Sequence, residues 1–138
     1  MFCLDTDVLS AVVKRDPPLH LIRRLARTPA TEQCTTAITL GELLYGGGVA
    51  RRGSSALAER VQNLIQSAGP VLPFDEPAAQ QYGRVRASLE RDGRRLAEPD
   101  LRIAAIVLSR DATLVTANVG HFARVPGLRV ENWLIDDA

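Results

Sequence analysis

Short apolar runs alternate along the chain with longer stretches in which apolar residues recur every three or four positions. The short runs are typical of buried strands, and the longer stretches have the period of amphipathic helices. The predicted strands are residues 2–5, 34–38, 71–74 and 113–116, with 128–134 as a candidate fifth. The predicted helices are residues 6–14, 18–28, a segment that begins at Thr39, 54–68, 76–92 and 99–110.

This alternation of strands and helices predicts an α/β fold. Short apolar strands must be covered on both faces, so we expect three layers, with a central, mainly parallel sheet of four or five strands flanked by helices. No internal repeat or dividing linker is visible, so residues 1–138 are expected to form a single domain. In such sheets ligands bind beyond the carboxyl ends of the strands, where the strand order reverses.

The composition is that of a globular protein, with 46% hydrophobic residues among 138. The chain has neither a run of about 18 apolar residues nor the basic start and apolar stretch of a signal peptide, so we expect a cytoplasmic protein without a membrane anchor. Cys3 and Cys34 both lie in apolar, strand-like runs. They are expected to be buried thiols, with a disulfide unnecessary.

The charged residues leave the partner open. Of 17 basic residues only Lys14 is a lysine, and the other 16 are arginines. Arginine suits RNA because it binds phosphate bidentately and stacks on bases, but a G+C-rich genome explains the same bias. A net charge of +1 argues against a general nucleic-acid coat. The candidate phosphate contacts, which solvated surface charge explains equally well, are Arg51, Arg52, Arg91, Arg94 and Arg95.

Three acidic residues follow predicted strands or open a buried helix, and each has a structural explanation. Asp5 can cap the helix that begins at Thr6. Thr39 and Glu42 match a capping box, in which the threonine caps the helix and the glutamate reaches back to it. Asp100, directly after a proline, suits the positive end of its helix.

Their joint placement suggests a metal site. Asp5, Glu42 and Asp100 can all project to the same sheet edge, where clustered carboxylates resist desolvation unless a cation neutralises them. An all-oxygen set favours Mg²⁺ or Mn²⁺. Zinc is disfavoured because His20 and His121 lie far apart and no Cys/His set has zinc spacing.

Polar residues also follow the strand at 113–116. Thr116 and Asn118 supply short oxygens at the same edge, for a weak or supporting role at the metal. Asn118 can instead cap a brief helical turn through Phe122. His121 can carry a proton at neutral pH, but a lone histidine on a loop is usually a solvated surface group, and we leave it out of the predicted site.

Five segments together resemble the PIN-domain nucleases and, within them, the VapC-type toxins of prokaryotic toxin–antitoxin pairs. They occur in the order and at the spacing of the family and span the whole chain. They are "LDTDVLS" (4–10), "TLGELLYG" (39–46), "PDLRIAA" (99–105), "LVTANVGHF" (114–122) and "PGLRVENW" (126–133).

Position by position, the resemblance implies that Asp5, Glu42 and Asp100 are the catalytic, metal-binding acids, and that Thr6 and Thr116 are the hydroxyl residues beside them. Two positions depart from the family pattern. Asn118 stands where many PIN domains have a fourth acid, which leaves a second metal position in doubt. Asp7 stands where asparagine is usual, and the helix dipole or a supporting contact explains it.

The resemblance implies a Mg²⁺- or Mn²⁺-dependent endoribonuclease toxin that cleaves RNA with a metal-activated water and inhibits growth. The implied partners are an RNA substrate, a second copy in a homodimer, and a VapB-like antitoxin, with which the toxin forms a hetero-oligomer that binds operator DNA through the antitoxin. The alternative is a PIN-like module that binds RNA or protein without cleaving, its acids serving as helix caps. A nucleotide-binding regulator lacks a phosphate loop.

Overall fold

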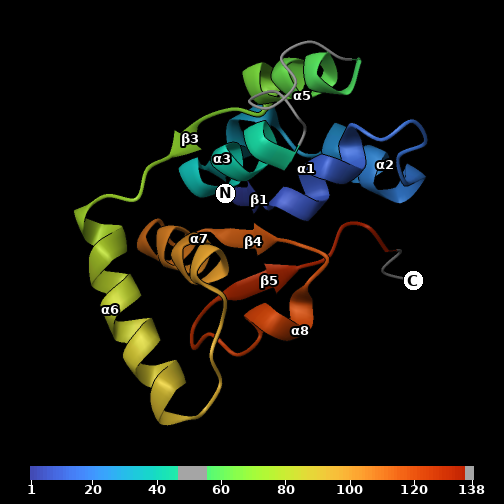
Figure 1. Cartoon of the computed structure of the whole chain (residues 1–138). Coiled ribbons are helices and arrows are strands. Elements are labelled where there is room, and N and C mark those ends of the chain that lie inside the picture. Colours follow the sequence, from blue (N-terminus) through green and yellow to red (C-terminus); the bar gives the residue numbers. More distant parts are fainter. Residues whose placement is uncertain (47–55, 136–138) are drawn as a thin grey trace.

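The computed structural model describes residues 1–46 and 56–135 (Figure 1). Five parallel strands form one sheet in the order β3-β2-β1-β4-β5, which confirms the predicted α/β fold with a parallel central sheet. The strands are β1 (Phe2–Leu4), β2 (Gln33–Thr36), β3 (Val71–Leu72), β4 (Thr113–Val115) and β5 (Arg129–Glu131).

Helices connect the strands, as the apolar periods predict. They are α1 (Thr6–Val12), α2 (Leu19–Arg27), α3 (Ala37–Gly46), α5 (Ala56–Ser67), α6 (Glu76–Arg91), α7 (Glu98–Ser109) and α8 (Val119–Phe122), with a 3₁₀ turn at Ala30–Glu32. The strand predicted at 71–74 ends at Leu72, because its partner β2 ends at Thr36, the register partner of Leu72. The candidate fifth strand is real but spans only three residues.

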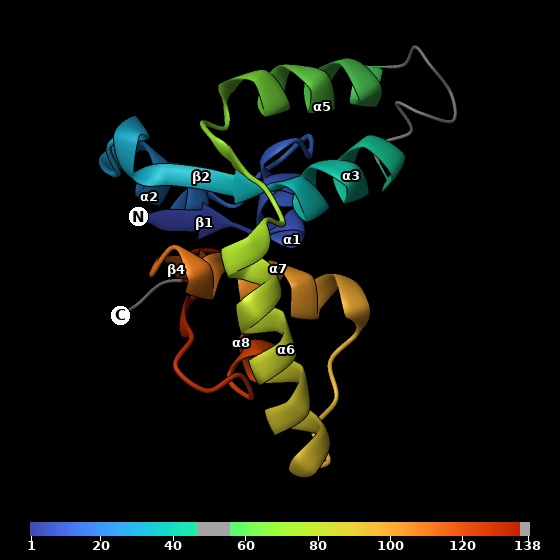
Figure 2. The ribbon, with the colours of Figure 1, turned by 90° about the vertical axis from the view of Figure 1, so that its left-hand side faces the viewer.

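Alternate residues of the central strands face two separate cores. Cys3 and Leu114 point into a core with α6, α7 and Phe122 of α8, whereas Leu4 and Val115 point into a second core with α1, α2 and α5. This is the period of two expected for a strand. Figures 1 and 2 show the resulting layers, with α6 and α7 on one side of the sheet and α1, α2 and α5 on the other.

The start of α3 corrects one prediction. The helix begins at Ala37, two residues before Thr39, and the Thr36 hydroxyl accepts a hydrogen bond from the Thr39 backbone N–H at 3.0 Å. Thr36 is therefore the cap, and the predicted capping box of Thr39 and Glu42 is wrong. The predicted strand at 34–38 ends early for the same reason. Glu42 is left free for another partner.

The strand order brings two strand ends together at the centre of the sheet. The chain moves outward from β1 through β2 to β3, and then returns to place β4 on the other side of β1. The Asp5 N–H donates to the Val115 carbonyl at 2.9 Å, so the ends of β1 and β4 are hydrogen-bonded neighbours. This is the reversal point at which parallel sheets bind ligands.

The two cysteines are buried, as predicted. Cys3 and Cys34 are register partners on neighbouring strands, and both are free thiols with no exposed surface. In the part of the chain that the structure describes, no helix has both the length and the apolar character needed to cross a membrane.

Candidate active site at the carboxyl edge of the sheet

Asp5 is the most deeply placed acid at this edge. It is the first residue after β1 and the N-cap of α1, with 6% of its surface exposed. One carboxylate oxygen accepts from the Thr6 N–H at 2.7 Å, and the other accepts from the Thr116 hydroxyl at 2.8 Å. Asp5 therefore is a helix cap, but this role uses only one of its two oxygens.

The environment of Asp5 favours its neutral form. Burial, followed by the nearby charge of Asp7, raises the pKa of Asp5 from 3.8 to about 6, with a smaller contribution from Asp100. The hydrogen bonds from Thr6 and Thr116 oppose this shift and do not offset it. A carboxylate held under such conditions is stabilised by any cation that reaches it.

Glu42 reaches the same place from α3. Its carboxylate accepts a 2.6 Å hydrogen bond from the hydroxyl of Thr6, which opens α1. The helix α3 thus presents Glu42 to the end of β1, across 36 positions of sequence. Thr6 fixes two acids at once, because its N–H holds Asp5 and its hydroxyl holds Glu42.

Asp100 lies in the first turn of α7, after Pro99. Burial and the charge of Glu42 raise its pKa, and the imidazole of His121 acts in the opposite direction. The Nδ1 atom of His121 is 3.8 Å from a carboxylate oxygen of Asp100. Asp100 is therefore within the electrostatic field of the other predicted acids.

These side chains line a single pocket of about 230 Å³ at the carboxyl edge of the sheet. Four of the residues that line it are carboxylates, and among the described lining residues none is basic. Thr116 is fully buried and holds Asp5 through its hydroxyl. The lining residues are Asp5, Thr6, Asp7, Glu42, Asp100 and Asn118.

The donor chemistry of the pocket suits a hard divalent cation. Carboxylate oxygens are the preferred ligands of Mg²⁺ and Mn²⁺. Burial and then neighbouring carboxylates raise the pKa values of Asp5 and Asp100, so their ionised forms are costly without a cation. Within the described ranges, no three acidic, histidine or cysteine side chains are already drawn together closely enough to hold an ion.

Comparison with known proteins identifies the family. A model of the PIN domain matches residues 2–128. This chain belongs to the PIN-domain family. Two relatives support a VapC-type member. Ribonuclease VapC2 of Haemophilus influenzae is 33% identical, over 96% of this chain and 98% of that protein. The tRNA(fMet)-specific endonuclease VapC of Salmonella typhimurium is 34% identical, over 96% of this chain and 97% of that protein.

A solved structure gives the same result for the fold of this PIN domain. DNA-bound VapBC from Salmonella typhimurium superposes with a TM-score of 0.81 and 34% identity, covering 96% of this chain and 97% of that chain. The three-layer PIN fold predicted from the sequence motifs is thereby confirmed.

Asp7 also lines the acidic pocket of the PIN domain. Its carboxylate accepts from the Ala117 N–H at 3.0 Å and lies 3.3 Å from the Thr116 hydroxyl. Asp7 thus ties the first turn of α1 to the segment after β4. The sequence offered two explanations for Asp7, the helix dipole and a supporting contact, and the structure shows such a contact.

The structure pairs Asn118 with His121 and does not show the predicted side-chain cap, while the supporting role of Asn118 at a metal stays a prediction. Asn118 occupies the N-cap position of α8, but its side chain makes no capping hydrogen bond. The amide nitrogen lies 3.0 Å from Nδ1 of His121 instead. Sequence reasoning left out His121, although its three-residue spacing from Asn118 within a helical turn was a signal that both share one face.

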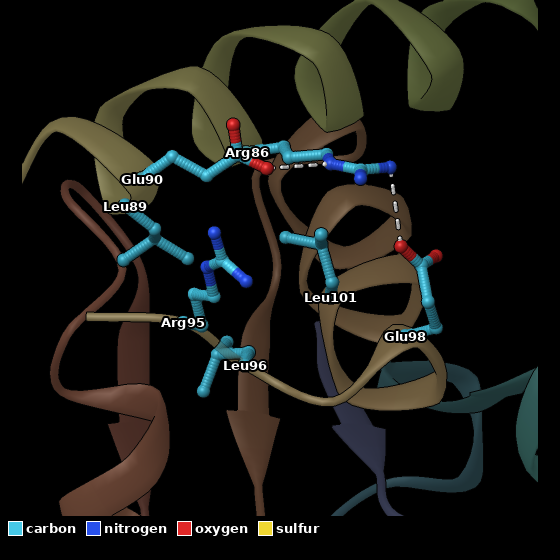
Figure 3. Close-up of a pocket in the computed structure, with 7 residues that line it drawn as sticks. All are labelled: Arg86, Leu89, Glu90, Arg95, Leu96, Glu98 and Leu101. Carbon is cyan, nitrogen blue, oxygen red and sulfur yellow. Dashed lines mark hydrogen bonds and ion pairs between the residues drawn. The ribbon is translucent and has the colours of Figure 1, made fainter. Parts of the chain in front are cut away.

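The candidate arginines are only partly described. Arg51 and Arg52 lie outside the described residues, while Arg91, Arg94 and Arg95 are exposed beyond or at the end of α6. Arg95 points into a separate pocket of about 200 Å³ between α6 and α7 (Figure 3). There Arg86 pairs with Glu90 at 3.0 Å and with Glu98 at 3.3 Å.

Proposed function

We propose that this VapC-type PIN domain is a Mg²⁺- or Mn²⁺-dependent endoribonuclease and the toxin of a VapBC-type toxin–antitoxin pair. The observation that carries the proposal is the pocket in which Asp5, Glu42 and Asp100 converge without a basic side chain among the described lining residues. The ribonuclease and endonuclease activities of the VapC relatives support it.

The proposed metal ligands are Asp5 and Asp100, with Glu42 binding directly or through water. Such an ion supplies charge stabilisation at the scissile phosphate and lowers the pKa of a bound water. The chain's own residues hold the site in place: Thr6 orients Asp5 and Glu42, and Thr116 orients the second oxygen of Asp5. With Asn118 at the fourth position, we expect one tightly bound ion.

The proposed reaction is the in-line attack of a water on the RNA phosphate, without a nucleophilic side chain. Deprotonated carboxylates are needed to hold the ion, and Glu42 can also accept a proton from the attacking water. The buried position of Asp5 keeps solvent away from one side of the site. Asn118 and Asp7 complete the wall of the pocket.

The test is cleavage of structured RNA by the purified protein. We expect cleavage with Mg²⁺ or Mn²⁺, none with EDTA, and a loss of at least about 100-fold for Asp100→Asn, because a carboxylate ligand contributes several kcal/mol. Arg23→Ala, an exposed change on α2, is the control and should retain full activity. Cleavage that persists in EDTA would contradict the proposal.

The alternative is a PIN domain that binds RNA or protein without cleaving. Asn118 favours it, because a neutral amide stands where many PIN domains have a fourth acid. Metal-dependent stability separates the two functions: at a concentration 100 times its dissociation constant, Mn²⁺ should stabilise a true metal site by about 2.7 kcal/mol. Acids that serve only as caps should give no saturable stabilisation.

The hydrogen bond between Thr6 and Glu42 gives a further prediction. Thr6→Val removes the hydroxyl and releases Glu42, and loss of such a supporting contact typically reduces metal affinity or activity by about 10 to 100-fold. Thr6→Ser keeps the hydroxyl and should retain most of both. Calorimetric Mn²⁺ titration together with cleavage rates checks this result, and equal values for the two variants would show that the hydrogen bond is unimportant.

The proposed partners follow from the same family. We expect a VapB-like antitoxin that places a basic side chain in the acidic pocket, because an electronegative pocket can bind a cationic side chain as well as a metal ion. The antitoxin should also carry the part that binds operator DNA. The DNA-bound VapBC complex of Salmonella typhimurium supports this assembly. A homodimer of the PIN domain is part of the same proposal.

A further inference from the structure

A basic pocket is lined by α8, the helix that follows Asn118 of the acidic pocket. Its volume is about 410 Å³. Its lining residues come from three places: the loop after α6, the helix α8, and the two residues that follow α8. We propose that this pocket binds the phosphate backbone of the RNA strand beside the cleavage point. The inference rests on the proposed ribonuclease function. The lining residues are Gly93, Arg94, Gly120, Ala123 and Arg124.

The two arginines of this pocket have donors available for phosphate. The guanidinium of Arg124 is held by one hydrogen bond, from Nη1 to the Arg95 carbonyl at 3.2 Å, which leaves its other N–H groups free. The guanidinium of Arg94 has no hydrogen bond or ion pair to any described residue. Of the described residues that line the pocket, none is acidic. Two uncompensated guanidinium groups are suited to a phosphodiester.

The remaining lining residues keep the pocket open. Gly93 has φ of +67°, and this left-handed turn ends α6 and directs the chain into Arg94. A Cβ atom added at Gly120 would meet no atom within 4 Å, so the space beside this glycine is open. Ala123 adds only a methyl group. A phosphate can therefore approach the backbone closely.

The pocket lies beside the acidic site in a way that suits a continuous strand. Asn118 lines the acidic pocket and Gly120 lines the basic one. Two residues span at most about 7 Å of chain, so the linings of the two pockets are close neighbours along the backbone. The four carboxylates repel RNA until a metal binds, and a neighbouring cationic pocket provides the attraction that holds the strand there.

Arg95 provides a matched control for this proposal. It is the next residue after Arg94 and carries the same charge, but its side chain points into the pocket between α6 and α7 (Figure 3). Its backbone carbonyl, which holds Arg124, is unaffected by a side-chain substitution. Arg95→Ala therefore changes the net charge in the same way as Arg94→Ala and leaves the proposed phosphate pocket intact.

The experiment measures binding of a labelled single-stranded oligoribonucleotide to the full chain in EDTA, between 50 and 200 mM salt. Each phosphate contact to single-stranded nucleic acid contributes about 0.7 to the slope of log K against log salt. We expect this slope to become shallower by about 0.7 for Arg94→Ala and for Arg124→Ala, and to stay unchanged for Arg95→Ala. Equal changes in all three variants, or no change in any, would overturn the proposal.

A second pair of variants removes no existing contact. Gly120→Glu and Gly120→Gln place side chains of the same shape in open space, and only glutamate adds a negative charge to the pocket. We expect Gly120→Glu to bind RNA several-fold more weakly than Gly120→Gln, and equal binding would overturn the pocket. Because binding is measured without metal, the result is independent of whether the protein cleaves RNA.

Discussion

Asp5→Asn is expected to reduce RNA cleavage at saturating Mg²⁺ by at least about 10³-fold, or roughly 4 kcal/mol of transition-state stabilisation. The change removes the charge of the most buried acid in the pocket and leaves its hydrogen-bonding shape intact. Single-turnover rates on one RNA substrate measure the effect.

Asp7→Asn is the matched control for this prediction. Its contact with the Ala117 N–H needs only an acceptor oxygen, which an asparagine amide also supplies. The substitution introduces the asparagine that the family resemblance implies at this position, and it should retain most of the activity. Similar losses in both variants, or full activity in Asp5→Asn, would show that Asp5 is not the principal ligand.

The same substitution at Asp5 is expected to stabilise the metal-free protein at neutral pH. Because the pKa of Asp5 is raised from 3.8 to about 6, the native state binds this proton more tightly than the unfolded state does. The free energy of unfolding therefore falls as the pH rises from about 4 to 6, and the loss persists above that range. Asp5→Asn removes this penalty, which amounts to at most about 3 kcal/mol.

Asparagine can keep the local hydrogen bonds of Asp5. The carbonyl oxygen of the asparagine can accept from the Thr6 N–H, and its amide can donate to the Thr116 hydroxyl oxygen. The Thr116 hydroxyl can then donate to the Asp7 carboxylate, whose oxygen lies 3.3 Å away. The gain in stability should therefore appear as a higher melting temperature in EDTA at pH 7, by about 10 °C at most. At pH 4 or below, wild type and variant should melt at similar temperatures.

Metal should reverse the order of the melting temperatures, so that wild type melts higher than Asp5→Asn. Saturating Mn²⁺ stabilises wild type by binding the native state and should leave Asp5→Asn nearly unchanged. Thermal melts in EDTA and in Mn²⁺, at pH 4 and pH 7, separate the pKa effect from the metal effect. If Asp5→Asn were less stable than wild type in EDTA at pH 7, ionised Asp5 would not destabilise the metal-free protein, which would contradict this prediction.

The predicted cap of α3 was wrong because two capping patterns compete for the same residues. The segment Thr36 to Glu42 contains two threonines at capping distance from a later residue, and local sequence does not choose between them. In the fold, Thr36 ends β2 in the sheet and is therefore the residue in position to cap α3. The Glu42 carboxylate is then held by Thr6 from another element.

The sequence by itself predicted the strand and helix order, the parallel sheet and three of the four acids that line the pocket, because apolar periodicity and polar residues beside strand and helix ends are local properties. Tertiary structure alone decided three further features. It joined the ends of β1 and β4, it paired Asn118 with His121, and it separated Arg94 from Arg95 into two pockets. Each depends on strand order or on side-chain direction, which is fixed only when distant segments pack together.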